Sequence, residues 1–368
     1  MEPEKHARIS PSGMAVTVGC HGSVIMQERY PNTPSADSIE GNASHWVAAH
    51  MLLGKPYGKV DPAGTVLDRD MVRHATKFAE YVLSIIRHRE LLRVEEYIDL
   101  PAIHAECGGT PDAHYLDRKA NALHIFDYKY GYSWVEAFEN WQGLAYAAGI
   151  MGVITHLPAD FTIHIHIVQP RASHPDGPIR TWSLKVSELI RYVERMAAAA
   201  RAALEPNPVC TTGKWCKNCR ARHECPTLQV SGYDILDLAG PSVPRELTNQ
   251  QRGAELCLLT RGMALLKARI TGLEAQVEAD LRAGQMYTTH HLGAGRGATI
   301  WDRPNDEVYA LGVACGKDLR QDKPITPTQA KDAGIHPDII KVYSKRIPGK
   351  LKLKESDPNQ GKKLFGGK

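Results

Sequence analysis

Apolar and polar residues recur with two different periods along the first two thirds of the chain. Spacings of three and four residues are typical of amphipathic helices, whereas alternation in steps of two is typical of strands. The first period predicts helices over residues 38–54, 66–93, 134–149 and 187–205. The second predicts strands over residues 94–103, 111–117, 122–130, 161–170 and 181–186. Helices and strands in this order predict an α/β fold with a mixed sheet flanked by helices.

The last third of the chain follows a different pattern. Residues 247–284 predict one long helix whose apolar residues recur in steps of three and four, as in a heptad seam. The seam consists of Leu256, Leu259, Met263, Leu266, Ile270, Leu273 and Val277. It indicates either a helix packed on its own domain or a dimerising coiled coil. From Ser344 onward, eight Lys or Arg residues accompany two acids, which predicts a basic tail. We therefore expect a first domain over residues 1–232 and a helical and mixed C-terminal region over residues 233–368.

Composition narrows the class of protein. The 368 residues carry a formal net charge of +4, which neither requires nor excludes a nucleic-acid partner. No apolar run approaches the roughly 18 residues of a membrane span, and the N-terminal segment lacks the apolar core of a signal peptide. We therefore expect a cytoplasmic protein that does not enter a membrane. In a reducing compartment, its eight cysteines favour metal ligands, catalytic groups or buried thiols over disulfides.

Two acids and a lysine converge around the second and third expected strands. Asp127 and Lys129 are two residues apart on one strand, so their side chains project from the same face. If the connecting turn is centred between Lys119 and Ala120, Asp112 lies directly opposite Asp127, with β-carbons about 5 Å apart. Carboxylates at that distance can share a hard divalent cation, which activates water and stabilises a developing charge. This segment is the strongest candidate for chemistry in the chain.

These residues resemble the motifs of the PD-(D/E)XK nuclease superfamily, and specifically of its RecB-like branch. Asp112 in GTPD matches the first acid, and Asp127 and Lys129 in FDYK match the acid-x-lysine motif. Residues 41–45 match the upstream G-x-x-x-H helix, and residues 142–146 match the downstream Q-x-x-x-Y helix. The order of all four motifs fits as well. Together with the segments SPSG and WCKNC, they are similar to a family of uncharacterised RecB-like proteins common in bacteriophages, over about residues 9–230.

The resemblance implies a restriction-endonuclease-like core and a role for each matching residue. Asp112 and Asp127 would hold Mg²⁺ or Mn²⁺, together with His45 and the main-chain carbonyl of Tyr128. Lys129 would position or activate the attacking water and stabilise developing charge.

The downstream helix would contact the substrate. Gln142 and Tyr146 are four residues apart and share one helix face, which the resemblance places beside bound DNA.

Two further pairs of residues each allow two interpretations. For Glu95 and Glu96 we favour a structural role. The alternative is that one of them is an extra acid of the site. We expect His164 and His166 to lie on a strand face that is exposed to solvent. The alternative is that they contact the substrate.

A cluster of cysteines follows the last helix of the first domain. Cys216, Cys219 and Cys225 form a C-x2-C-x5-C pattern, which resembles that of RecB-like nucleases carrying an iron-sulfur cluster. In those proteins the fourth ligand lies far upstream, a position that Cys20 occupies here, and four thiolates suit a 4Fe-4S cluster. Cys210 could replace Cys20, and a zinc site with Cys210 is chemically possible. Zinc ribbons, however, use two close cysteine pairs, and only one occurs here.

The sequence therefore predicts a metal-dependent DNA nuclease that hydrolyses phosphodiester bonds. We expect an exonuclease of phage or bacterial replication or recombination, whose partners are DNA and a single-strand-binding or recombination protein. The main alternative is a non-catalytic DNA-binding or assembly factor on the same fold. A second alternative is a metal-stabilised interaction protein that acts through its C-terminal helix.

Overall fold

The computed structural model divides into two compact units, Met1–Arg269 and Ile270–Lys368. The residues that it describes are 7–152, 158, 160–238, 248–295, 297–319, 325–347 and 351–355. The division lies within the long helix α8 (Asn249–Arg282), whereas the boundary expected after residue 232 lies within α7 (Pro226–Leu238). Among the described residues, no helix is both long and apolar enough to cross a membrane.

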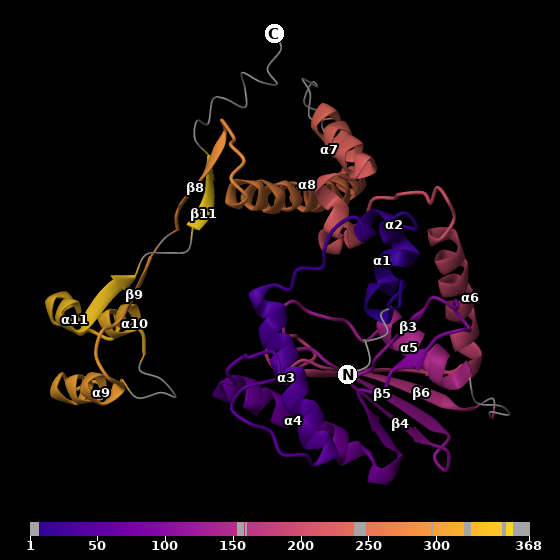
Figure 1. The fold of residues 1–368 in the computed structure, drawn as a ribbon, viewed down its shortest axis with the longest axis horizontal. Helices are drawn as coiled ribbons and strands as arrows, with labels where there is room; N and C mark the ends of the chain where they lie inside the picture. Colours follow the sequence, from indigo (N-terminus) through magenta and orange to yellow (C-terminus); the bar gives the residue numbers. More distant parts are fainter. Residues whose placement is uncertain are drawn as a thin grey trace. The chain divides into compact units, whose positions relative to one another are not determined.

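A five-stranded mixed sheet forms the centre of the first unit, in the order β1-β4-β5-β6-β7 (Figure 1). Only β5 and β6 pair in parallel, and the other neighbours are antiparallel. The strands are β1 (Leu92–Val94), β4 (Ala113–Asp117), β5 (Ala122–Tyr128), β6 (Thr162–Val168) and β7 (Ile179–Lys185). A separate short hairpin joins β2 (Ile98–Asp99) to β3 (Gly108–Gly109). The expected mixed sheet flanked by helices is therefore confirmed.

Helices cover both faces of this sheet (Figure 1). One face packs against α3 (Ala36–Leu53) and α4 (Arg69–Ile85) through strand residues such as Phe126 and Tyr128. The other packs against α5 (Trp141–Gly152) and α6 (Val186–Ala203). The N-terminal elements are η1 (Pro11–Gly13), α1 (Met14–Gly19) and α2 (Ser23–Glu28), and the short turns are η2 (Arg89–Leu91), η3 (Lys214–Asn218) and η4 (Arg220–His223).

Some expected elements are shorter in the structure. The helix expected from residue 134 begins at Trp141, because Asn140 caps it by accepting a hydrogen bond from the N–H of Gly143 (2.9 Å). The N-cap Asp68 likewise sets the start of α4 by accepting from the N–H of Met71 (2.8 Å). The strand expected over residues 94–103 is interrupted at Glu95, whose φ of 51° ends β1.

The prediction of a solvated histidine face is wrong for His166. This side chain is only 4% exposed, because α4 covers its face of β6. Its Nδ1 lies 2.9 Å from the hydroxyl of Tyr81, and its Nε2 lies 3.0 Å from Nδ1 of His124. His164 is partly buried and stacks on His124 with ring centroids 4.7 Å apart. The alternation of apolar residues in β6 showed that one face of the strand is buried, but it could not show that helices also cover the face that carries the histidines.

The second unit has its own small core. It is formed by Val308, Leu319, Ala330, Ile335 and Ile340. Its strands pair as two antiparallel ladders, β8 (His290–Ala294) with β11 (Leu351–Glu355), and β9 (Ala298–Trp301) with β10 (Ser344–Ile347). Its helices after α8 are α9 (Asn305–Ala314), α10 (Pro327–Asp332) and α11 (Pro337–Tyr343). The end of the expected basic tail, residues 356–368, lies outside the described residues.

The part of α8 that belongs to the first unit, residues 249–269, packs there through a face other than the heptad seam. Leu265 and Ala268 are buried in a cluster with Cys216 and Leu228. Five seam residues are exposed, namely Leu256, Leu259, Met263, Ile270 and Leu273. The helix therefore packs on its own domain, but not through the residues that suggested it, and the coiled coil stays a prediction.

Candidate functional site

The hairpin of β4 and β5 brings the two predicted acids together. The register pairs Ala113 with Phe126 and Asp117 with Ala122, so one further step places Asp112 opposite Asp127. The main-chain N–H of Tyr128 donates a hydrogen bond of 2.6 Å to Oδ2 of Asp112. The predicted register is therefore confirmed, and Asp112 is anchored to the strand that carries Asp127.

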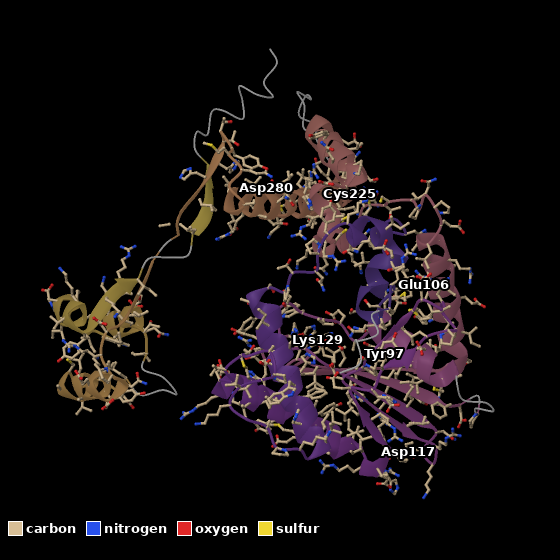
Figure 2. The ribbon with its side chains drawn as sticks, in the orientation of Figure 1. Tyr97, Glu106, Asp117, Lys129, Cys225 and Asp280 are labelled. Atoms are coloured by element: carbon tan, nitrogen blue, oxygen red, sulfur yellow. The ribbon has the colours of Figure 1, made fainter. Side chains whose placement is uncertain are left out.

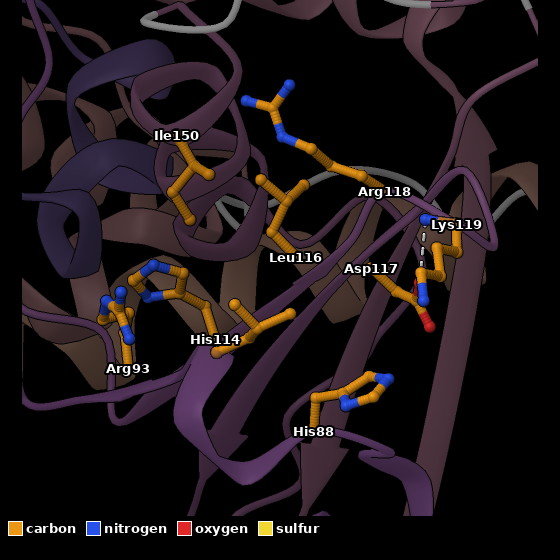
Figure 3. Close-up of a pocket in the computed structure, with 9 residues that line it drawn as sticks. His88, Arg93, His114, Leu116, Asp117, Arg118, Lys119 and Ile150 are labelled. Atoms are coloured by element: carbon orange, nitrogen blue, oxygen red, sulfur yellow. Dashed lines mark hydrogen bonds between the residues drawn. The ribbon is translucent and has the colours of Figure 1, made fainter.

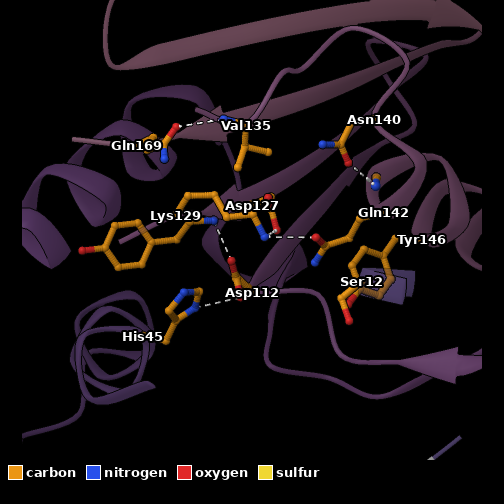
Figure 4. A network of polar contacts seen from close by, with 12 residues as sticks. Ser12, His45, Asp112, Asp127, Lys129, Val135, Asn140, Gln142, Tyr146 and Gln169 are labelled. Carbon is orange, nitrogen blue, oxygen red and sulfur yellow. Dashed lines mark hydrogen bonds and ion pairs between the residues drawn. The ribbon is translucent and has the colours of Figure 1, made fainter. Parts of the chain in front are cut away.

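Lys129 lies directly after β5 and contacts the second acid. Its Nζ lies 3.0 Å from Oδ1 of Asp127 and donates a hydrogen bond of 3.0 Å to Oε1 of Gln142 on α5 (Figure 4). The main-chain N–H of Lys129 donates to the carbonyl of Val168 (2.9 Å), which continues the β5–β6 pairing beyond the strand. The ammonium group is thus held at a fixed place beside the acids.

His45 reaches the first acid from α3. Its Nδ1 lies 3.0 Å from Oδ1 of Asp112, and its ring lies beside Tyr128 with centroids 4.9 Å apart. The hydroxyl of Tyr128 shares a hydrogen bond of 2.8 Å with that of Ser44, one residue before His45 on the same helix. This contact fixes the helix on the strand and so directs the imidazole towards the site.

Glu95 joins the site, although its sequence context favoured a structural use. One atom each of His45, Glu95 and Asp112 lie within 4.8 Å of one another, a spacing that could hold a metal ion. The N–H of Glu95 donates to the carbonyl of Asp112 (3.2 Å), so the break in β1 lies next to the first acid. The only signal for this placement is the pairing of β1 with β4, which no local pattern reveals.

Charges and burial act against each other within the site. Burial raises the pKa of Asp127 above its usual value, against the opposing effect of the Lys129 charge. Burial also acts to raise the pKa of Asp112, but the charge and hydrogen bond of His45 outweigh it and lower that pKa. Protein atoms around the carboxyl group of Glu95, together with the nearby Asp112, raise its pKa to about 7.

The donor set fits a hard divalent cation. It offers carboxylate oxygens, which are the ligands that Mg²⁺ and Mn²⁺ prefer, together with one imidazole nitrogen. Oδ2 of Asp127 is buried and has no hydrogen-bond partner among the described residues. Burying an unpaired carboxylate oxygen is costly, and a bound cation would remove that cost. The role of the Tyr128 carbonyl as a ligand stays a prediction.

The two residues expected beside DNA have different surroundings. Gln142 is partly exposed and contacts Lys129. Tyr146 is only 4% exposed, and its hydroxyl donates a hydrogen bond of 2.8 Å to the carbonyl of Thr110, two residues before Asp112. Tyr146 therefore anchors the approach to the first acid, and its contact with DNA stays a prediction.

A groove of about 640 Å³ opens onto the site. It is lined by Asn42, His45, Trp46, Ala49, His50, Leu53, Lys55, Glu95 and Asp112. Its volume lies within the range of roughly 300–1,000 Å³ that is common for ligand sites. The groove thus reaches His45, Glu95 and Asp112, whereas Asp127 and Lys129 do not line it.

A comparison with models of protein families assigns the chain to a family. Residues 6–359 match the model described as "Protein of unknown function (DUF2800)". The chain belongs to the DUF2800 family. Because the match spans both compact units, the second unit is part of what defines a DUF2800 protein rather than an addition to this chain.

Five cysteines of this DUF2800 chain line one cavity in the first unit. They are Cys20, Cys210, Cys216, Cys219 and Cys225. The N–H of Thr211 points to Sγ of Cys20 (3.3 Å), which joins the N-terminal helices to the later cysteines. Figure 2 labels Cys225 in this region and Lys129 in the carboxylate site.

The thiols lie close enough to influence one another. Burial and the neighbouring Cys20 and Cys225 raise the pKa of Cys210 to about 12. Burial is also the largest cause of the raised pKa of Cys216 and Cys219, and Cys20 contributes to both shifts. Cys20 thus lies near Cys216 and Cys219, and Cys210 lies beside Cys20. Both candidates for the fourth ligand are therefore in the cavity.

Proposed function

We propose that this DUF2800 chain is a metal-dependent deoxyribonuclease of the RecB-like PD-(D/E)XK type, with a restriction-endonuclease-like core. The observation that carries the proposal is the placement of Asp112 opposite Asp127, with the ammonium of Lys129 3.0 Å from the second acid. We propose exonuclease action in phage or bacterial replication or recombination, in the cytoplasm and together with a single-strand-binding or recombination protein.

His45, Asp112 and Asp127 would hold the Mg²⁺ or Mn²⁺, with Glu95 as a further carboxylate. A divalent cation bound there supplies Lewis-acid chemistry and lowers the pKa of water. Oδ2 of Asp127, which is buried and has no hydrogen-bond partner in the part of the chain that the structure describes, supports this assignment.

Lys129 would act as a fixed positive charge. Burial acts to lower its pKa, but Asp127 and Asp112 raise it above the usual value. Its ammonium group would position the attacking water by donating hydrogen bonds and stabilise the additional negative charge on the phosphate. Gln142 holds the ammonium group in place for both tasks.

The cysteine cavity would hold a 4Fe-4S cluster through Cys20, Cys216, Cys219 and Cys225. The C-x2-C-x5-C pattern with a distant fourth cysteine, rather than two close cysteine pairs, favours a cluster over a single zinc ion.

A nuclease assay on end-labelled single- and double-stranded DNA with Mn²⁺ tests the proposal. The wild-type protein should shorten labelled DNA. Asp112→Asn should abolish both cleavage and calorimetric Mn²⁺ binding, whereas Asp37→Asn, an exposed acid at the start of α3, should change neither. DNA binding without cleavage of either substrate would support the alternative of a non-catalytic DNA-binding or assembly factor.

A further inference from the structure

A second cavity, of about 330 Å³, lies on the same sheet as the candidate site (Figure 3). It is lined by His88, Leu91, Arg93, His114, Leu116, Asp117, Arg118, Lys119 and Ile150. The proposed nuclease chemistry uses none of these residues. Its volume is sufficient for a small ligand or for one unit of a larger one.

The rim of this cavity is cationic. Arg118 and Lys119 come from the β4–β5 turn, and Arg93 comes from β1. The carboxylate of Asp117 accepts hydrogen bonds from the main-chain N–H groups of Lys119 (3.0 Å) and Ala120 (2.9 Å), so the turn already partners its charge. Arg93 also lies 3.4 Å from an oxygen of Glu96, an exposed pair that contributes little. The balance at the rim favours an anion.

The floor of the cavity is mainly apolar. Leu116 and Ile150 supply aliphatic surface, and His114 lies beside them (Figure 3). His114 is 8% exposed, and its Nδ1 has no hydrogen-bond partner among the described residues. A buried ring nitrogen without a partner is costly unless a ligand supplies one. An apolar floor, an unpaired nitrogen and a cationic rim suit a ligand that has both a ring system and a phosphate.

Strand register relates this cavity to the candidate site. Arg93 on β1 pairs with His114 on β4, and the next contact along both strands is the hydrogen bond from Glu95 to Asp112. Residues two apart on a strand share a face and lie about 6.6 Å from each other. On β4, His114 lies two residues from Asp112, whereas the turn that carries Arg118 and Lys119 follows Asp117, five residues from Asp112 and therefore roughly 17 Å away. That distance corresponds to several steps between neighbouring phosphates along an extended nucleic-acid strand.

We propose that the cavity around His114 binds a nucleotide of the substrate strand several positions away from the one being cleaved. Arg93, Arg118 and Lys119 contact its phosphates, and the base lies on the floor formed by Leu116 and Ile150. This proposal rests on the proposed nuclease function and adds a substrate-binding subsite to it.

The test measures binding of fluorescein-labelled oligothymidylates by fluorescence anisotropy. All variants are made in full-length Lys129→Ala protein, so that the DNA is not consumed. The pocket variant is Arg118→Glu with Lys119→Glu, two side chains of a surface turn. The control is Lys77→Glu with Arg201→Glu, exposed cations on α4 and α6 that make the same change in net charge. Thermal melting checks that both variants are folded.

We expect the pocket variant to bind a twelve-residue strand about tenfold more weakly than the control. The slope of its log–log salt dependence should fall by about 0.7 for each phosphate that the variant no longer neutralises. A dinucleotide, which cannot span both places, should bind the pocket and control variants equally. Equal affinities of the two variants for the longer strand would overturn the subsite, as would an equal reduction in affinity for the dinucleotide.

Failure of the subsite and failure of the proposed function give different results. Wild-type protein that cleaves DNA, combined with a pocket variant that binds like the control, refutes only the subsite. Wild-type protein that neither cleaves nor binds any strand refutes both. Neutral substitution, Arg118→Gln with Lys119→Gln, should give an intermediate loss of affinity, which separates lost attraction from introduced repulsion.

Discussion

The carboxylate site and the cysteine cavity lie in the same compact unit but are built from opposite kinds of chain contact. Asp112, Asp127 and Lys129 come from a single hairpin and its immediate flanks, so local strand pairing alone sets their spacing. The cysteine cavity joins Cys20 to residues about 190 positions later, through contacts such as that of Thr211. A site made by local pairing keeps its geometry without its ion, whereas a cavity closed over a long loop gains stability from its ligand.

The largest expected effect concerns catalysis at the locally built site. Lys129→Ala should lower the rate of DNA cleavage by about 10²–10³-fold, because it removes a fixed charge that stabilises the transition state. Binding of Mn²⁺, measured by calorimetry, should change little, because Lys129 does not hold the ion. Lys77→Ala is the control for loss of a positive charge. Undiminished hydrolysis by Lys129→Ala would contradict the assigned role.

The next effect concerns stability at the cavity built from distant segments. Cys20→Ser should bleach anaerobically purified brown protein and lower the free energy of unfolding by about 2–5 kcal/mol, as expected for losing a cross-link over a long loop. Cys210→Ser should keep the colour. Denaturant titration and visible absorption measure the two effects. Stoichiometric zinc without iron would reject the cluster, and bleaching by Cys210→Ser alone would exchange the fourth ligand.

Acid should affect the sheet under the carboxylate site through its histidines. Burial lowers the pKa of His166 to about 3, well below the usual value of about 6.5. Because the unfolded chain then binds more protons, His166 contributes stability above pH 6.5 that is lost as the pH falls. The loss should reach about 2 kcal/mol at pH 5. Urea titrations at pH 7 and 5 measure it, and His166→Gln should show a smaller pH dependence. An unchanged dependence would show that other groups cause it.

A smaller effect tests Glu95, which the sequence supported only as the alternative extra acid of the site. Glu95→Gln should weaken Mn²⁺ binding by about tenfold, because it removes one carboxylate charge from the group that also contains His45 and Asp112. Glu96→Gln, on the neighbouring residue, is the matched control. Equal affinities of both variants would return Glu95 to a structural role.

The smallest effect concerns the position of the ammonium group. Gln142→Ala should reduce cleavage about three- to tenfold, because Lys129 loses one hydrogen-bond partner but keeps Asp127. Gln142→Glu, which can still accept this hydrogen bond, should retain more activity. If Gln142→Ala weakens DNA binding and leaves the turnover rate unchanged, the residue contacts substrate rather than positioning Lys129.

Local patterns predicted those parts of the structure that depend on local pairing. The opposition of Asp112 and Asp127 followed from strand period and the centre of one turn. Glu95 was only the less favoured alternative, because its position depends on β1 pairing with β4, which no connecting turn predicts. His166 was misjudged because the cover over its face comes from α4, about 85 residues earlier. Cys20 was identified only through resemblance, since nothing near it in sequence indicates a partner near residue 211.

The turn between β4 and β5 constrains which mutations this chain can accept during evolution. Asn121 has a φ of 51°, and the turn fixes which residues of the two strands face each other. Exchanging one side chain for another there leaves the pairing intact. Inserting or deleting a single codon would shift the pairing by one residue and turn every side chain of one strand to the opposite face, which would separate the two acids. Changes in length at this turn should therefore be far rarer among functional descendants than changes in residue type.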